Sequence, residues 1–151
     1  MTVPRRFVVA QFILFAVFAA AWLILPRSES MQSPGIAPVV LLAPVIIFLW
    51  ALASFQRQSR AMPNVTPTPN QQTGLVQSGI YKWIRHPIYT AVITGALGAS
   101  LLNGHPVVYV LVVVFAIFFT FKSSYEETLL SSVFPEYASY RTRTGLFLPF
   151  L

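Results

Sequence analysis

Residues 87–121 read PIYTAVITGALGASLLNGHPVVYVLVVVFAIFFTF, two apolar runs separated by the polar turn at 103–105. A proline begins each run and a glycine follows the first one, which is the usual placement of these residues at helix starts and ends. The stretch therefore predicts a helical hairpin over residues 87–102 and 106–121. Each run is short for a bilayer core of about 30 Å at about 1.5 Å per residue. We expect the second helix to continue through the acidic pair that follows, toward Phe134.

Two longer apolar runs precede the hairpin. Residues 7–25 are interrupted only by Gln11, and residues 36–53 contain no polar side chain. Each reaches about the thickness of a bilayer core, so both are predicted to span it. Pro44 is tolerated in such a helix and is expected to bend it. A cleaved signal peptide is the alternative for the first run, but its length and the spans that follow favour a membrane helix.

Composition points to lipid as the main solvent. Of 151 residues, 56% are hydrophobic and only 9% are charged, which is too apolar for a soluble domain of this size. The absence of cysteine excludes disulfides, thiolate chemistry and cysteine-bound metals. The fold class predicted is an all-α membrane protein, with four transmembrane helices, a C-terminal helical hairpin and an interfacial C-terminal tail. The bilayer is the expected partner, and nucleic acid is not expected, because no basic patch is interleaved with aromatic residues.

The charge distribution predicts the orientation in the membrane. The proline-rich, polar stretch at 56–79 reads as a solvent-side loop, which divides the single domain into helices at 1–55, a loop at 56–84, and the hairpin with its tail at 85–151. Four spans then put both termini and this loop on one side, together with every Lys and Arg except Arg27. The positive-inside rule makes that side cytoplasmic. The short chain without added domains favours the inner membrane of a prokaryote.

The start of the hairpin carries the first candidate site. Arg85 and His86 precede Pro87, and Tyr89 lies nearby. The first N–H groups of a helix are unpaired and the positive end of its dipole attracts anions, while an arginine suits a carboxylate. The alternative is that Arg85 and His86 only anchor a helix end at the interface.

The second candidate site consists of two adjacent acids, Glu126 and Glu127. Alone they are better explained as a solvated turn of helix, but the hairpin brings them to the membrane surface that holds Arg85 and His86. A ligand with a carboxylate, an ammonium, a sulfonium and ribose hydroxyls would match this division of charge. No metal is expected, because His86 and His105 are separated by a span.

These motifs resemble a known superfamily. The string SGIYKWIRHPIY at 78–89, followed by Glu126-Glu127, Phe134, a Tyr-x-x-Tyr tail and a closing Leu-Pro, resembles the isoprenylcysteine carboxyl methyltransferase and phospholipid methyltransferase superfamily of integral membrane enzymes. The resemblance covers roughly the second half of the chain. It implies an S-adenosyl-L-methionine pocket, and it implies roles for the following residues: cofactor binding by Arg85, His86, Tyr89, Glu126 and Glu127, and catalysis by His86 and Glu127.

The resemblance leaves the methyl acceptor open. The first two spans match only as hydrophobic helices, and Ala91 and Pro135 stand where the family often has glycine. We expect a lipid-soluble or amphiphilic acceptor: an isoprenoid or lipid carboxylate, a thiol or an amine. A carboxylate or thiolate needs no general base, whereas an amine or hydroxyl needs one.

Several alternatives stay open at this point. An NADPH-dependent membrane reductase of the sterol or enone type carries a similar motif before a helix, and a non-catalytic scaffold needs no site at all. Tyr137 and Tyr140 in the tail favour an interfacial anchor, with contact between Arg141 or Arg143 and the cofactor as the sharper alternative. A homo-oligomer that completes the pocket is also compatible with the sequence.

Overall fold

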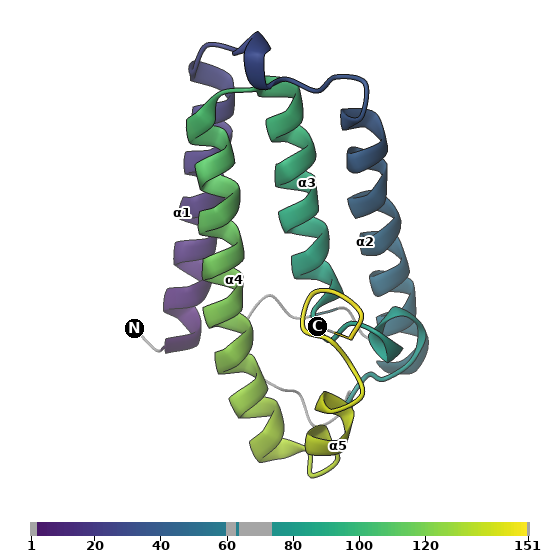
Figure 1. Cartoon of the computed structure of the whole chain (residues 1–151). Coiled ribbons are helices and arrows are strands. Elements are labelled where there is room, and N and C mark those ends of the chain that lie inside the picture. Colours follow the sequence, from purple (N-terminus) through teal and green to yellow (C-terminus); the bar gives the residue numbers. More distant parts are fainter. Residues whose placement is uncertain (1–2, 60–62, 64–73, 151) are drawn as a thin grey trace.

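The protein is a bundle of four long helices, and the computed structural model describes residues 3–59, 63 and 74–150. The long helices run side by side, and a short fifth helix lies at one end near the tail (Figure 1). Their bounds are α1 (Val3–Ile24), α2 (Ala37–Ser59), α3 (Pro87–Asn103), α4 (Pro106–Val133) and α5 (Tyr137–Arg141).

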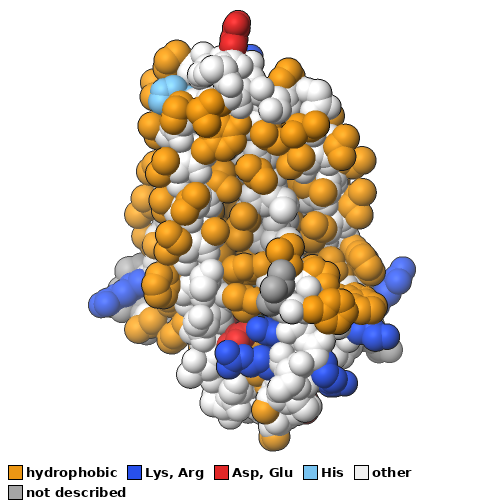
Figure 2. Space-filling view, in the orientation of Figure 1, with side chains coloured by type: hydrophobic (Ala, Val, Ile, Leu, Met, Phe, Trp, Pro, Cys, Tyr) orange, Lys and Arg blue, Asp and Glu red, His pale blue; other side chains and the backbone are white. Residues whose placement is uncertain are grey.

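The surface of the bundle fits a membrane. Helices α1, α2 and α4 are long and apolar enough to cross a bilayer, and α3 is a shorter apolar helix of 17 residues. Hydrophobic side chains cover the sides of the bundle, while blue Lys and Arg side chains gather toward the end that holds the tail (Figure 2). The predicted all-α membrane protein is confirmed, and α4 runs on to Val133, as the short length of its apolar part predicted.

Helix α3 packs closely against its neighbours because its contact residues are small. A Cβ atom added at Gly98 would lie 2.8 Å from the side chain of Leu41 on α2, and one added at Gly95 would lie 3.6 Å from Pro44. Toward α1, the carbonyl oxygen of Ala99 accepts a hydrogen bond of 2.8 Å from the Trp22 ring nitrogen. These small residues on α3 therefore let the neighbouring helices approach closely.

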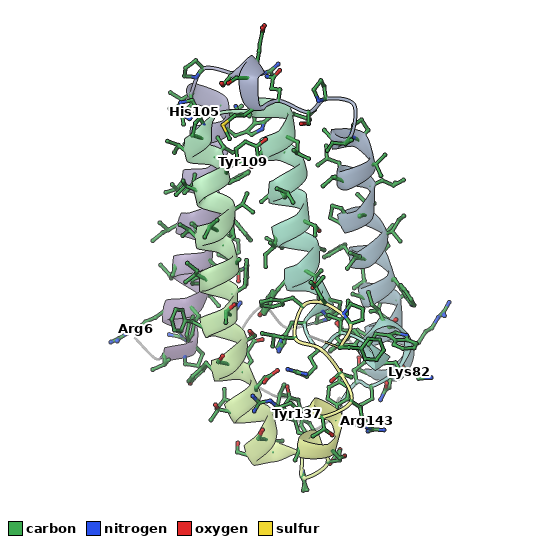
Figure 3. All side chains as sticks on the ribbon, in the orientation of Figure 1. Arg6, Lys82, His105, Tyr109, Tyr137 and Arg143 are labelled. Carbon is green, nitrogen blue, oxygen red and sulfur yellow. The ribbon has the colours of Figure 1, made fainter. Side chains whose placement is uncertain are left out.

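The turn between α3 and α4 ends one helix and begins the next. Gly104 is in the left-handed conformation with φ of 77°, which favours glycine at a helix C-cap. The His105 ring accepts a hydrogen bond from the Val107 N–H and so caps α4. His105 lies at the end of the bundle opposite the tail (Figure 3). The contact seen there is the hydrogen bond that caps α4 at the turn.

Helix α2 extends beyond the apolar run at 36–53 from which it was predicted. It continues to Ser59, because polar side chains can extend a helix out of the membrane. Before α3 the chain forms a short 3₁₀ helix, η3 (Gly79–Lys82). Most of the rest of the expected loop at 56–84 lies outside the described residues.

Candidate functional site

His86 lies between the two acids of α4. It is the N-cap residue of α3, but its side chain does not cap the helix. Its Nδ1 is 3.4 Å from Glu126 Oε2 and its Nε2 is 3.5 Å from Glu127 Oε1. His86 is 9% exposed and Glu127 is 5% exposed, so these charges meet away from water. The hairpin thus brings the histidine motif and the paired acids together, as predicted.

Arg85 holds one acid and the tail at the same time. Its Nε donates to Glu127 Oε1 at 2.6 Å. Its Nη1 donates to the backbone carbonyls of Arg141, at 3.1 Å, and Thr144. A planar guanidinium can bind several acceptors in fixed directions, which an ammonium cannot do in the same way. Arg85 therefore positions Glu127 and anchors the returning tail.

Tyr89 holds the other acid. Its hydroxyl donates to Glu126 Oε1 at 2.6 Å. Its ring stacks on His86, with centroids 5.4 Å apart and an interplanar angle of 3°, and on Phe119 of α4 at 4.5 Å. The ring and the hydroxyl are thus both held, and the direction of Glu126 is restricted with them.

The tail folds back over the site. Residue Gly145 pairs with Ile84 in a parallel bridge, and the backbone N–H groups of Arg85 and His86 donate to Gly145 and Leu146. Deeper in, the Thr90 hydroxyl donates to the Phe147 carbonyl at 2.7 Å. Backbone bonds on both sides of the motif therefore join the tail to the start of α3.

The tail tyrosines point inward, which corrects the interpretation of Tyr137 and Tyr140 as interfacial anchors. They are 1% and 4% exposed. The Tyr140 hydroxyl donates to the backbone carbonyl of Tyr81 at 2.7 Å. The Tyr137 side chain lies near α4 (Figure 3), and its hydroxyl has no hydrogen-bond partner among the described residues. The backbone bonds of the tail explain the difference, because they turn this face toward the bundle rather than toward lipid.

The surroundings change the pKa of His86 and of the two tail tyrosines. Burial lowers the pKa of His86, but the contacts of its ring nitrogens with the carboxylates of Glu126 and Glu127, and the negative charges of these acids, outweigh burial, so the net shift is upward. Burial raises the pKa of the Tyr137 and Tyr140 hydroxyls. The site is therefore organised around a histidine that the two acids favour in its charged form.

The two tail arginines differ in their contacts. Arg141 Nε lies 3.4 Å from Glu127 Oε2, whereas Arg143 donates to the Ser139 carbonyl on the exposed side of the tail. Sequence reasoning did not identify Thr144, because its shorter contact with Arg85 is made by a backbone carbonyl, which any residue type could supply, and its hydroxyl adds only a longer contact of 3.4 Å. In the described ranges, no group of three His, Cys, Asp or Glu is placed to hold a metal ion.

Fold and site together define a class: a helical membrane protein with a buried histidine, arginine and paired-acid site at one end of its bundle. The model of the family described as phospholipid methyltransferase matches residues 36–137, which is more than half of the chain. The chain belongs to this family, and the resemblance seen in its motifs is confirmed.

Similar proteins come from two kinds of organism. The chain is 38% identical over 76 residues to the cobalt-zinc-cadmium resistance protein CzcN of Cupriavidus metallidurans, a match that covers 50% of this chain and 35% of that protein. It is 35% identical over 79 residues to the protein-S-isoprenylcysteine O-methyltransferase of Saccharomyces cerevisiae, covering 51% of this chain and 33% of the yeast protein. The matched segment thus spans about a third of the length of each relative.

Proposed function

We propose that the protein is a membrane methyltransferase that uses S-adenosyl-L-methionine and acts on a lipid-soluble or amphiphilic acceptor. The observation that carries the proposal is the meeting of His86, Arg85 and Tyr89 with Glu126 and Glu127 at one end of an apolar bundle, in a chain of this family. When bound, the sulfonium of the donor supplies an activated methyl group.

The buried polar groups suit such a donor. Glu126 and Glu127 can accept hydrogen bonds from an amino group or from ribose hydroxyls, and they balance positive charge. Among the described residues, the buried Tyr137 hydroxyl has no hydrogen-bond partner, and His86 Nε2 makes no hydrogen bond beyond its ion-pair contact of 3.5 Å with Glu127 Oε1. Buried polar groups are rarely left unpaired, so this arrangement favours a polar ligand beside them. Arg85 holds Glu127 in place and attracts the carboxylate of the ligand.

The acceptor side is argued from the apolar surface. A shallow groove between α2 and α3 has an almost wholly apolar lining, formed by Pro44, Val45, Phe48, Leu49, Ala91 and Val92. It reaches the first turns of α3, close in sequence to Tyr89. An acceptor with a hydrocarbon part can approach such a surface from the bilayer. Its reactive end would be a carboxylate, a thiol or an amine.

The residues would act mainly by alignment. With a carboxylate or thiolate acceptor, displacement at the methyl carbon of the sulfonium neutralises both charges, so a dry, oriented site favours the reaction over water. For a carboxylate or thiolate acceptor no proton has to move. For an amine or hydroxyl acceptor, the Glu127 carboxylate, or His86 once it has lost its own proton, would take the proton.

We also propose that the site and both termini face the cytoplasm of a prokaryotic cell. The cations near the site end support this orientation, since cytoplasmic loops are enriched in Lys and Arg. Reporter fusions to each terminus, with enzymatic activity on only one side of the membrane, test it. A reporter at the C-terminus that is active outside would contradict the orientation.

The first test is binding of S-adenosylhomocysteine to the detergent-solubilised protein by calorimetry, with NADPH in a parallel titration. We expect micromolar binding of the former, and loss of it in Glu127→Gln and His86→Ala. The matched controls are Glu136→Gln, an exposed acid, and His105→Ala, the second histidine at the far end of the bundle; both should bind as the wild type does.

The outcomes separate the functions. Binding of NADPH alone would replace the proposal with a reductase. Binding of neither ligand would overturn the enzyme proposal and favour a scaffold.

A further inference from the structure

A polar pair lies buried inside the bundle, apart from the contacts described above. Lys122 on α4 is 1% exposed, and its Nζ donates to Gln11 Oε1 on α1 at 2.6 Å. Gln11 is the buried residue of α1, and it interrupts an otherwise apolar run. Polar and charged side chains within membrane helices are costly to bury and commonly serve function. The pair therefore needs an explanation beyond helix packing.

Lys122 connects this pair to the candidate site. Its Nζ lies 5.1 Å from the ring centroid of Tyr89, a distance at which an ammonium is attracted to the ring. The hydroxyl of the same ring donates to Glu126. Glu126 also follows Lys122 by four residues on α4, so the two side chains share one face of the helix. A continuous set of contacts thus runs from α1 through Lys122 and Tyr89 to Glu126.

We propose that Lys122, held by Gln11, is a positioning residue for the hydrogen bond between Tyr89 and Glu126, and that α1 belongs to the functional site. The inference rests on the proposed function, since the ligand that Glu126 would bind is the methyl donor. The family match begins at residue 36, so Gln11 lies outside it. The contribution of α1 is thus read from this chain's own contacts.

A purely structural role makes a different prediction. When a buried polar or charged pair only holds helices together, its replacement by apolar residues of similar size is often neutral or stabilising. Under that role, the double variant Gln11→Leu/Lys122→Met would bind ligand like the wild type. A positioning role predicts that the same variant folds but binds poorly, because the ammonium beside Tyr89 is gone.

The test is calorimetric binding of S-adenosylhomocysteine to five proteins: the wild type, Lys122→Met, Gln11→Leu/Lys122→Met, Gln11→Glu and Lys82→Met. Thermal unfolding of each in the same detergent checks that it is folded. We expect binding weakened about tenfold in both variants that lack Lys122, a typical coupling between contacting groups. Gln11→Glu keeps an acceptor for the ammonium and should bind within about twofold of the wild type. Lys82→Met removes an exposed lysine and should bind as the wild type does.

The outcomes separate this inference from the proposed function. Equal binding by the wild type and the folded double variant would overturn the inference alone. A wild-type protein that does not bind S-adenosylhomocysteine would overturn the proposed function and the inference with it. A folded Gln11→Glu variant that binds as weakly as Lys122→Met would show that the contact with Gln11 does not act by holding the ammonium, and would also refute the proposal.

Discussion

Replacing Arg85 with lysine tests whether its guanidinium holds the tail over the site. In the wild type, Nε binds Glu127 and Nη1 binds the carbonyls of Arg141 and Thr144. An ammonium keeps the charge, but it cannot present donors in these separate directions, so we expect it to keep the contact with Glu127 and to lose the two carbonyls.

The magnitude follows from the lost hydrogen bonds. Two of them at about 1 to 1.5 kcal/mol each lower the free energy of opening of the tail by about 2 to 3 kcal/mol. Such a change corresponds to roughly 30- to 150-fold faster exchange of the amides that opening exposes. The amides concerned are those of Arg85, His86 and Gly145, whose N–H groups bond between the tail and the motif.

The assay is hydrogen–deuterium exchange read by mass spectrometry on peptides that cover 83–90 and 141–147. Arg143→Lys is the matched control, since Arg143 is exposed and its side chain donates to the carbonyl of the nearby Ser139. The control should leave exchange in both peptides unchanged. If Arg85→Lys exchanges at the wild-type rate there, the guanidinium is not what holds the tail, and the reasoning fails.

Three further predictions concern the titration of His86 and the removal of the two buried tail hydroxyls. The pKa of His86 in the fold lies above its ordinary value of 6.5, so its ion pairs stabilise the protein fully below that pH and are lost as the pH rises through the folded pKa. The melting temperature should fall over that range in the wild type, and this dependence should be absent in His86→Gln. Tyr140→Phe should lower the free energy of unfolding by about 1 kcal/mol, because a buried carbonyl loses its donor. Tyr137→Phe should leave stability unchanged, because that hydroxyl has no partner among the described residues, while it weakens ligand binding.

Each of these has a contradicting result. A melting temperature with the same pH dependence in the wild type and His86→Gln would show that other groups carry it. Equal destabilisation by Tyr137→Phe and Tyr140→Phe in denaturant unfolding would show that the two hydroxyls are held alike, against the observed contacts.

Much of the fold could be predicted because a membrane helix is recognisable from its own stretch of sequence. An apolar run of sufficient length must be helical in lipid, since its backbone groups have no water to bond. Proline and glycine then marked the hairpin at residues where the structure indeed turns, with Gly104 in the left-handed conformation. The end of α2 was less predictable, because polar residues that follow an apolar run can either continue the helix or form a loop.

The candidate site was predictable in part for a similar reason. The length of the hairpin helices sets where Arg85, His86, Glu126 and Glu127 lie along the bundle axis, so sequence order and helix rise bring them to one end. The sequence by itself therefore determined the membrane setting, the helices, the turn and the residues that meet.

Only the tertiary structure decided how those residues are held. The fold of the tail onto Ile84 and Arg85 depends on backbone carbonyls, which carry no residue signature, and it turned Tyr137 and Tyr140 inward. The contact between Gln11 and Lys122 joins residues 111 positions apart, on helices whose mutual rotation no local pattern specifies. Side-chain packing between helices sets that rotation, and it exists only once the bundle has assembled.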